Sequence, residues 1–192
     1  MSRWEPNART RLERASLELF VERGYDNTTV AEIAERAGLT KRTFFRHFAD
    51  KREVLFGGQE ILSRLFTEAI AGAPASATPL ETIAAALAAV APIFNLDRFE
   101  LVLRRQEVIA AHTDLQEREL LKAATLTAVM AEGFRARGLA DLAAGVAAEL
   151  GQLAFRTAFF RWVASGGREF VHIAKEVVAD LQTAAELVTT GQ

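Results

Sequence analysis

Apolar residues recur along the chain at intervals of three and four, the spacing of one face of an α-helix, and no stretch keeps the period of two that marks a strand. The pattern predicts an all-α fold of about nine helices without an internal repeat. The expected helices are residues 7–23, 29–37, 41–48, 51–71, 79–94, 98–111, 113–137, 140–164 and 168–189. The Gly-, Pro- and Ser-rich stretch 72–79 is predicted to be a loop.

Two short helices with a tight turn between them stand out near the N-terminus. Thr29 and Glu32 form a capping box, which starts the first of these helices. Gly38 ends it, because a residue past a helix C-terminus often needs a positive φ, and Thr40 begins the second helix two residues later. Such a short link is typical of two helices that cross steeply, so the pattern predicts a helix-turn-helix.

The second of these helices combines two aromatic anchors with a dense cluster of cations. Phe44 and Phe48, four residues apart, are expected to hold it to the core. Between Thr40 and Arg52 there are five basic residues and one acidic residue, in a chain of net charge −2. Cations near helix N-termini are unfavourable unless an anion is present, and a DNA backbone supplies phosphates. The alternative is a solvated basic face. The residues predicted to contact DNA are Thr29, Thr40, Lys41, Arg42, Thr43, Phe45, Arg46, His47 and Lys51.

Residues 9–56 resemble the DNA-binding domain of the tetracycline-repressor (TetR) family of transcription regulators. The matching residues, in the family's order and spacing, are Ala15, Leu19, Phe20, Gly24, Tyr25, Thr28, Thr29, Val30, Ile33, Ala34, Ala37, Gly38, Thr43, Phe48, Lys51 and Leu55. The rest of the chain resembles the family only in length and helical character. The resemblance implies a three-helix DNA-binding head on a helical body that binds a ligand and forms dimers.

Two residues depart from the family pattern. Arg42 stands where a small residue, often glycine, is usual, and Phe45 stands where tyrosine is usual. Phe45 lacks the phenolic hydroxyl that would donate to a phosphate. Arg42 adds a guanidinium that reaches either a phosphate or a guanine edge. The resemblance therefore does not fix the base contacts.

The expected domains are residues 1–57, a DNA-binding head, and residues 58–192, a body for ligand binding and dimerisation. Basic residues outnumber acidic ones in the head, and the reverse holds in the body, which fits a body that avoids DNA. Gly57-Gly58 suits either a pivot between the two or close packing against a neighbouring helix. Arg3, Arg9 and Arg11 form either a phosphate-binding arm or an ordinary polar terminus.

The last two predicted helices are apolar over more than one face. A surface helix needs a single apolar face, so this breadth predicts burial against both the body and a second copy of the chain. The alternative is that these helices are central in the monomer. The residues predicted to form the dimer interface are Phe160, Val163, Phe170, Ile173, Val177, Leu181, Ala184 and Val188. Two-fold pairing would place two recognition helices about 34–36 Å or more apart, on a palindromic operator of double-stranded DNA.

Phenylalanine is abundant, with 13 residues, and many of them lie in the body. The resemblance implies that the body encloses a pocket for an inducer, and aromatic walls favour a small hydrophobic ligand. The alternative is that these residues only fill a core. The predicted pocket residues are Phe66, Phe94, Phe99, Leu103, His112, Met130, Phe134, Phe155, Phe159 and Trp162, and the candidate polar groups are Arg104, Arg105, His112 and Trp162.

Other classes of protein have little support in the sequence. There is no cysteine, the three histidines are isolated, and no glycine-rich phosphate loop or serine elbow occurs, so we expect no catalytic residue, no metal and no cofactor. The longest apolar run, Ile83–Phe94, is shorter than the roughly 20 residues of a transmembrane helix. The N-terminus lacks the apolar stretch of a signal peptide. We expect a cytoplasmic protein without membrane contacts.

These inferences together predict a homodimeric repressor that binds a palindromic operator and is released by a small hydrophobic inducer. The resemblance, rather than any residue, favours repression. Two alternatives remain open: a dimeric DNA-binding regulator without a small-molecule ligand, and a small all-α enzyme with an apolar pocket.

Overall fold

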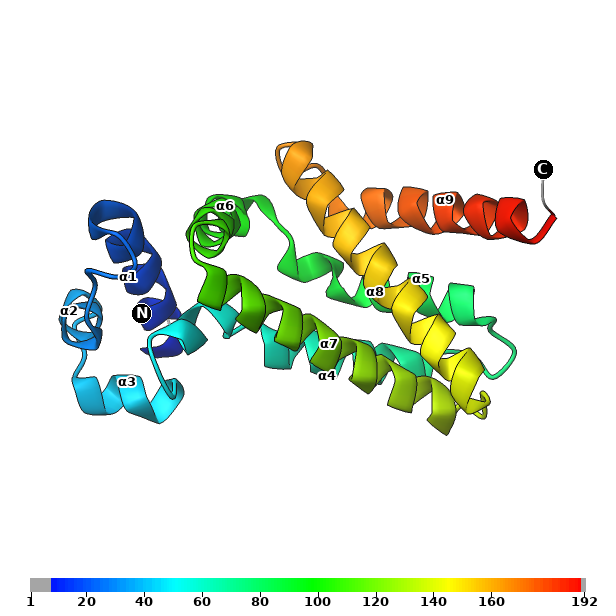
Figure 1. Ribbon diagram of the computed structural model, residues 1–192, viewed down its shortest axis with the longest axis horizontal. Coiled ribbons are helices and arrows are strands. Elements are labelled where there is room, and N and C mark those ends of the chain that lie inside the picture. The colour runs from blue at the N-terminus through cyan, green and yellow to red at the C-terminus, as the bar shows by residue number, and fades with distance from the viewer. Residues whose placement is uncertain (1–7, 191–192) are drawn as a thin grey trace, which may run out of the picture. The chain divides into compact units, whose positions relative to one another are not determined.

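The computed structural model describes residues 8–190, and in this range the chain consists of nine α-helices and two 3₁₀ segments (Figure 1). The α-helices are α1 (Ala8–Arg23), α2 (Val30–Arg36), α3 (Lys41–His47), α4 (Gln59–Gly72), α5 (Pro79–Val90), α6 (Leu96–Ala110), α7 (Thr113–Ala136), α8 (Asp141–Ala164) and α9 (Phe170–Thr190). The 3₁₀ segments are η1 (Arg52–Phe56) and η2 (Ala91–Ile93). The predicted all-α class and the number of helices are confirmed.

Two of the predicted helices differ from the observed ones. The single helix expected over residues 51–71 is divided into η1 and α4 at Gly57-Gly58, since glycines weaken a helix interior. The helix expected over residues 79–94 ends as an α-helix at Val90 and continues as η2. Pro92 explains this change, because its nitrogen has no hydrogen to donate to the preceding turn.

The chain divides into two compact units, which we describe separately. Among the described residues, the first consists of residues up to 59 together with Glu100–Glu119, and the second of residues 60–99 together with those from 120 onward. The head predicted from the sequence ended at residue 57. No pattern in the sequence assigned Glu100–Glu119 to it, and this segment supplies buried side chains to the same core.

The first unit is built on one hydrophobic cluster. Leu12, Leu19 and Phe20 of α1 pack with Ile33 of α2 and Phe44 of α3, all of them at most 3% exposed. Residues of η1 and of the segment 100–119 complete the cluster, namely Val54, Leu55, Phe56, Val108, Ile109 and Leu115. The short helices α2 and α3 bury too little area to be stable alone, so their positions depend on this shared core.

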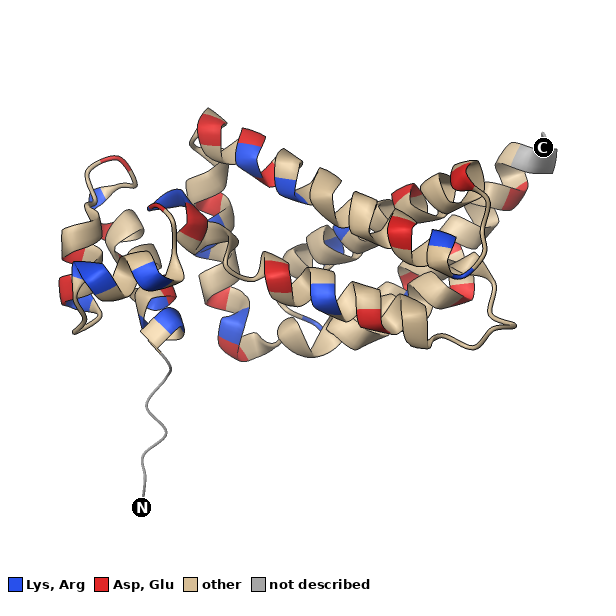
Figure 2. Ribbon diagram, turned by 90° about the horizontal axis from the view of Figure 1, so that it is seen from below, with Lys and Arg blue, Asp and Glu red and all other residues tan. Residues whose placement is uncertain are grey.

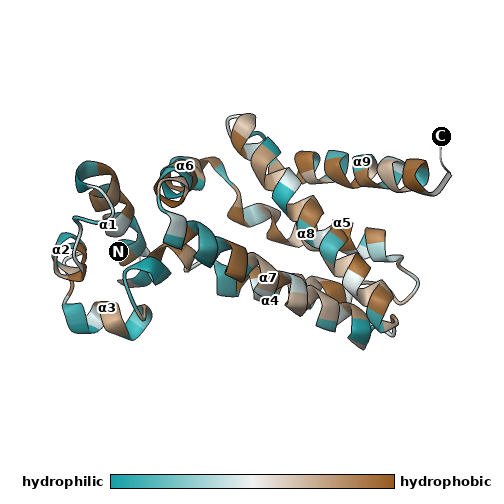
Figure 3. Ribbon diagram, viewed as in Figure 1, coloured by the Kyte–Doolittle hydropathy of each residue, from teal (hydrophilic) through white to brown (hydrophobic). Residues whose placement is uncertain are grey.

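In the second unit α5, α8 and α9 pack on one another (Figure 1). The side of α8 that enters the core carries small residues, which allow the helix backbones to approach closely. A Cβ added to Gly151 of α8 would lie 3.0 Å from Sδ of Met130. The same close approach occurs on α7, where a Cβ added to Gly133 would lie 3.0 Å from Cγ2 of Ile70. Figure 3 shows hydrophobic residues along much of α8 and α9. These two helices therefore belong to the monomer core, whatever else they contact.

No single helix within residues 8–190 has the length and apolarity to cross a membrane. One bent pair, Pro79–Ile93 with Leu96–Ala110, has the length and apolarity of a membrane span only when its two segments are counted together.

Candidate functional site

The turn between α2 and α3 has the geometry of a helix-turn-helix. Gly38 has φ 64°, and its N–H and that of Leu39 donate to the last turn of α2, to Glu35 O at 2.9 Å and Ala34 O at 2.8 Å. This is a Schellman motif, in which the positive φ favours glycine. The Arg11 guanidinium donates to Ala37 O in the same turn, and thereby ties it to α1.

Both helices of the motif begin at the predicted threonines. The Thr29 Oγ1 accepts from Glu32 N, and the Glu32 carboxylate accepts from Thr29 N at 2.8 Å, so the predicted capping box is confirmed. These bonds with Thr29 lower the pKa of the Glu32 carboxyl. Thr40 caps α3 by accepting from Thr43 N at 3.1 Å. The start of the candidate recognition helix is therefore fixed by its own sequence.

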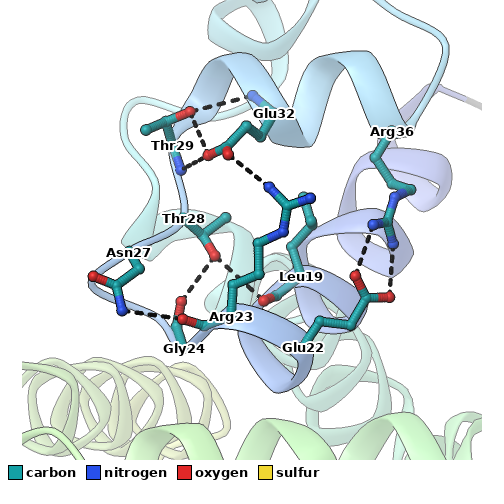
Figure 4. A network of polar contacts seen from close by, with 9 residues as sticks. All are labelled: Leu19, Glu22, Arg23, Gly24, Asn27, Thr28, Thr29, Glu32 and Arg36. Carbon is teal, nitrogen blue, oxygen red and sulfur yellow. Dashed lines mark hydrogen bonds and ion pairs between the residues drawn. The ribbon is translucent and has the colours of Figure 1, made fainter.

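Ion pairs hold α1 and α2 together (Figure 4). Arg36 of α2 binds Glu22 of α1 through two hydrogen bonds of 2.9 and 2.7 Å, which lower the pKa of the Glu22 carboxyl. Arg23 binds Glu32 at 2.8 Å. The buried Thr28 hydroxyl donates to Gly24 O at 2.8 Å and closes the connection between the helices. The acidic residues of these helices thus neutralise nearby arginines, and basic and acidic segments are interleaved in Figure 2.

Three basic residues of α3 have no such acidic partner. They are Lys41, Arg42 and Arg46, and we call them the α3 cations. All three are exposed, and none has a hydrogen bond or ion pair within the described part of the chain. The other Lys and Arg residues between Ala8 and Gly57 all have a partner: Arg9, Arg11, Arg14, Arg23, Arg36, Lys51 and Arg52. The described cations of the head that lack both an ion pair and a hydrogen bond therefore lie on one helix.

The remaining α3 residues predicted to contact DNA differ in accessibility. Phe45 is 56% exposed, an unusual position for a phenylalanine, and it shares the outer surface of α3 with the α3 cations. Thr43 is half-buried, and its hydroxyl is hydrogen-bonded to that of Thr40. His47 is half-buried, and its Nε2 is buried without a hydrogen-bond partner in the described residues.

Lys51 has a structural role that the sequence did not predict. Its ammonium donates to Tyr25 O at 2.6 Å and Thr28 O at 3.0 Å, and lies 4.1 Å from the centre of the Tyr25 ring. Burial lowers the pKa of Lys51. The proposed phosphate contact of Lys51 would have to compete with these bonds.

Two arginines of the expected N-terminal arm also have partners within the head. Arg9 donates to Gly57 O at 2.7 Å, and Arg11 binds the turn between α2 and α3. Arg3 lies outside the described residues.

The packing interpretation of the glycine pair gains support at Gly57. Gly57 is buried, and a Cβ there would meet the Glu13 carboxylate and lie 3.2 Å from Nη2 of Arg9. Gly58 is exposed, with open space around its Cα.

Three side chains of the segment 100–119 bind the head. Arg105 donates to Leu55 O, lies over the Phe56 ring and pairs with Glu119 at 3.0 Å; burial lowers its pKa. Arg118 binds the Glu53 carboxylate, with a 2.9 Å bond from its Nε. Neither contact could be predicted from the sequence, because both join residues far apart in the chain.

His112 is the third, and it belongs to the first unit, whereas most of the predicted pocket residues belong to the second. Its Nδ1 donates to Val108 O at 2.8 Å, its ring lies 4.9 Å from that of Tyr25, and its Nε2 is 3.6 Å from the Asp26 carboxylate. Burial raises the pKa of Tyr25 to about 12, and Asp114 adds to the effect. Leu103, also predicted for the pocket, belongs to the first unit as well.

The second unit brings most of the predicted pocket residues together. We use the name aromatic cluster for Phe66, Phe94, Phe99, Phe155, Phe159, Trp162 and Phe170, whose rings form a continuous series of contacts. Phe94 is central: it stacks on Phe170 at 4.4 Å and lies 5.4 Å from Trp162. Met130 and Phe134 are buried in the core of the same unit.

Part of the predicted dimer interface is buried inside the monomer. Phe170, Ile173 and Val177 are at most 1% exposed, because this side of α9 packs into the core of the unit. Much of the apolar stripe of α9 therefore packs inside the monomer, which the sequence pattern did not indicate. Phe160 and Val188 are exposed at 57% and 84%. Ala184 is also exposed, and Val163 and Leu181 are half-buried.

Comparison with known proteins gives matches for the N-terminal part of the chain. Residues 13–56 match the family of bacterial regulatory proteins of the tetR type. The HTH-type transcriptional regulator TcmR of Streptomyces glaucescens is 43% identical over 82 residues, which are 43% of this chain and 36% of TcmR. The chain thus matches about a third of that relative's length. The match to regulatory proteins agrees with the prediction that the chain is not an enzyme.

Similar solved structures extend over most of the chain. One is FadR of Thermus thermophilus, a TetR-family repressor in complex with lauroyl-CoA, with 25% identity, a TM-score of 0.55, and coverage of 89% of this chain and 91% of FadR. Another is the complex of SmeT with triclosan, with 17% identity, a TM-score of 0.60, and coverage of 94% and 91%. The SmeT likeness shows the fold alone.

Proposed function

We propose that the protein is a homodimeric transcriptional repressor, which binds an inverted-repeat operator and is released by a small hydrophobic ligand. The proposal starts from the match of residues 13–56 to the TetR family of bacterial regulatory proteins and from the similarity to TcmR. The observation that carries the proposal is the concentration of unpaired cations, Lys41, Arg42 and Arg46, on the second helix of a helix-turn-helix.

The lack of partners at the α3 cations favours a role in DNA binding over that of an ordinary solvated surface. An exposed cation with a carboxylate nearby gains little from DNA, because binding must first break the existing ion pair. A cation without such a partner gains the phosphate interaction in full and releases counterions. Arg42 and Arg46 also have the guanidinium geometry that binds a guanine edge through two hydrogen bonds. Phe45 adds an apolar surface able to contact a thymine methyl group.

The dimer that we propose uses the outer face of α8. Leu142, Val146, Leu153 and Phe160 are all exposed, at spacings of four and seven residues, so they form one apolar stripe along the helix. Asp141, Glu149 and Arg156 lie beside it around a surface groove. An apolar centre with a charged rim is the usual composition of a protein interface. We propose this stripe as the interface in place of the buried α9 residues, together with Leu181, Ala184 and Val188 of α9.

The aromatic cluster supports the proposed ligand response. Clusters of aromatic rings line many small-molecule sites. Two proteins of similar fold have been solved with small molecules that carry apolar groups, lauroyl-CoA with its acyl chain and triclosan with its aromatic rings. The alternative, a regulator without a ligand, predicts that such molecules leave DNA binding unchanged. We also expect the protein in the cytoplasm, where the DNA is.

The experiment that tests the proposed function is transcription in vitro from a promoter that overlaps a DNA sequence selected by the protein. We expect the purified protein to reduce the transcript, and the variant with Lys41, Arg42 and Arg46 all replaced by Ala to leave it unchanged. A ligand of the aromatic cluster should restore the transcript. An increased transcript with wild-type protein would contradict repression, and equal effects of both proteins would contradict the assigned site.

A further inference from the structure

Trp162 is the one candidate polar group of the predicted pocket that has no polar partner in the described residues. Arg104 pairs with Glu100 at 3.0 Å, and Arg105 and His112 are bound in the first unit. The Trp162 side chain is 0% exposed, and its Nε1 is buried without a hydrogen-bond partner.

An unpaired indole N–H is unfavourable in a protein interior. Buried donors nearly always bind an oxygen or a nitrogen, since burial removes the water they would otherwise bind. Trp162 is instead surrounded by rings, with Phe99 at 5.0 Å, Phe94 at 5.4 Å and Phe159 at 6.3 Å. A ring face is a weaker acceptor than an oxygen, so these neighbours leave most of the donor's hydrogen-bonding capacity unused.

The cluster around Trp162 is not sealed. Phe94, Phe99, Phe155 and Phe159 are each only half-buried, whereas Phe66 and Phe170 are fully buried. Phe155, Phe159 and Trp162 are three and four residues apart on α8, so they share one face of that helix. Gln152, three residues before Phe155, has a buried amide oxygen that also lacks a partner in the described residues. Partly open aromatic faces thus surround an unused donor and lie near an unused acceptor.

We propose that Trp162 Nε1–H is the hydrogen-bond donor of a ligand site in the aromatic cluster, and that the site takes neutral, planar, mainly apolar molecules carrying a carbonyl-type acceptor. The cluster contains no charged side chain, so an ionised ligand would lose its hydration without compensation. Flat apolar molecules match the ring faces, and the acceptor fixes their orientation. This inference rests on the proposed ligand response and specifies its ligand class.

The first test compares a ketone with a hydrocarbon of nearly the same shape, 2-acetylnaphthalene with 2-ethylnaphthalene, by equilibrium dialysis against the full chain. We expect wild-type protein to bind the ketone about tenfold more tightly, the effect of one buried hydrogen bond. Trp162→Phe keeps an aromatic ring and removes the N–H, so it should bind both probes alike. Equal affinities in the wild type, a preference that survives in Trp162→Phe, or binding of neither probe would overturn the inference.

A second measurement does not depend on the folding of Trp162→Phe. Trp4, outside the described residues, is the only other tryptophan, so in a Trp4→Phe background a ¹⁵N-indole spectrum reports Trp162 alone. We expect 2-acetylnaphthalene to shift the indole proton signal downfield, as a new hydrogen bond does, and 2-ethylnaphthalene to cause no such shift. Equal responses to both would contradict a donor role. Failure here with an intact operator complex would refute only the ligand site, whereas loss of operator binding would refute the proposed function.

Discussion

Arg46→Gln tests whether the α3 cations meet DNA phosphates. The substitution removes one exposed positive charge that has no partner in the described chain and keeps a good helix former in α3. Each phosphate neutralised contributes about 0.9 to the slope of log K against log salt concentration. A dimer presents two copies of Arg46, so the slope should become shallower by about 1.8. Between 50 and 200 mM salt, the variant should therefore lose about tenfold less affinity than the wild type.

Arg14→Gln is the matched control. It makes the same change in charge on α1, but Arg14 is paired with Glu18 at 3.0 Å, so it should not contribute to the slope. The assay is fluorescence anisotropy of a labelled operator duplex, titrated with each protein at five or more salt concentrations. An Arg46→Gln slope equal to that of the wild type would remove the phosphate contact. Equal changes in both variants would show that only net charge matters, and would refute the assignment to α3.

Further predictions concern the frame that holds α3. Gly38→Ala should lower the free energy of unfolding by about 1–2 kcal/mol, because Gly38 has φ 64° and a Cβ there would lie 2.8 Å from Nη2 of Arg11; unchanged denaturant midpoints would refute this. Lys51→Met should cost about 1–3 kcal/mol, since Tyr25 O and Thr28 O lose their donor, and should leave the salt slope unchanged; a shallower slope with unchanged stability would instead restore the phosphate role. Tyr25, the only tyrosine, should ionise near pH 12 in the folded protein when its absorbance at 295 nm is followed. The folded state favours the neutral phenol, so the stability that Tyr25 contributes is complete below pH 10, the ordinary phenol pKa, and should fall as the pH rises toward 12. A titration midpoint near pH 10 in the folded protein would contradict the burial of Tyr25.

The parts of the fold that the sequence predicted well are those decided by neighbouring residues. Thr29 and Glu32 cap α2 through bonds across three positions, and Gly38 ends it because few other residues adopt its backbone angle. Thr78 and Glu81 form the same kind of capping box, and α5 begins at residue 79 as predicted. Such signals depend little on the rest of the chain.

Contacts between distant residues could not be predicted in this way. Lys51 belongs to a basic run, and only the fold shows that its ammonium binds carbonyls more than 20 positions earlier. Arg105 was predicted as a candidate polar group of the ligand pocket, and only the fold shows that it binds Leu55 O and Glu119. Arg118 carried no signal in the sequence of its contact with Glu53. The apolar stripe of α9 did not indicate which of its residues face the monomer core, so Phe170 and Val188 were grouped although one is buried and the other exposed.

Selection of bound sequences from a random duplex DNA pool, at near-physiological salt, tests the central claim most directly. We predict that the wild-type protein enriches an inverted repeat, whose two halves reflect the two α3 helices of a dimer. The variant with Lys41, Arg42 and Arg46 replaced by Ala should enrich nothing. An absence of enrichment with the wild type, or the same repeat enriched by the variant, would contradict the account of α3 as the recognition helix.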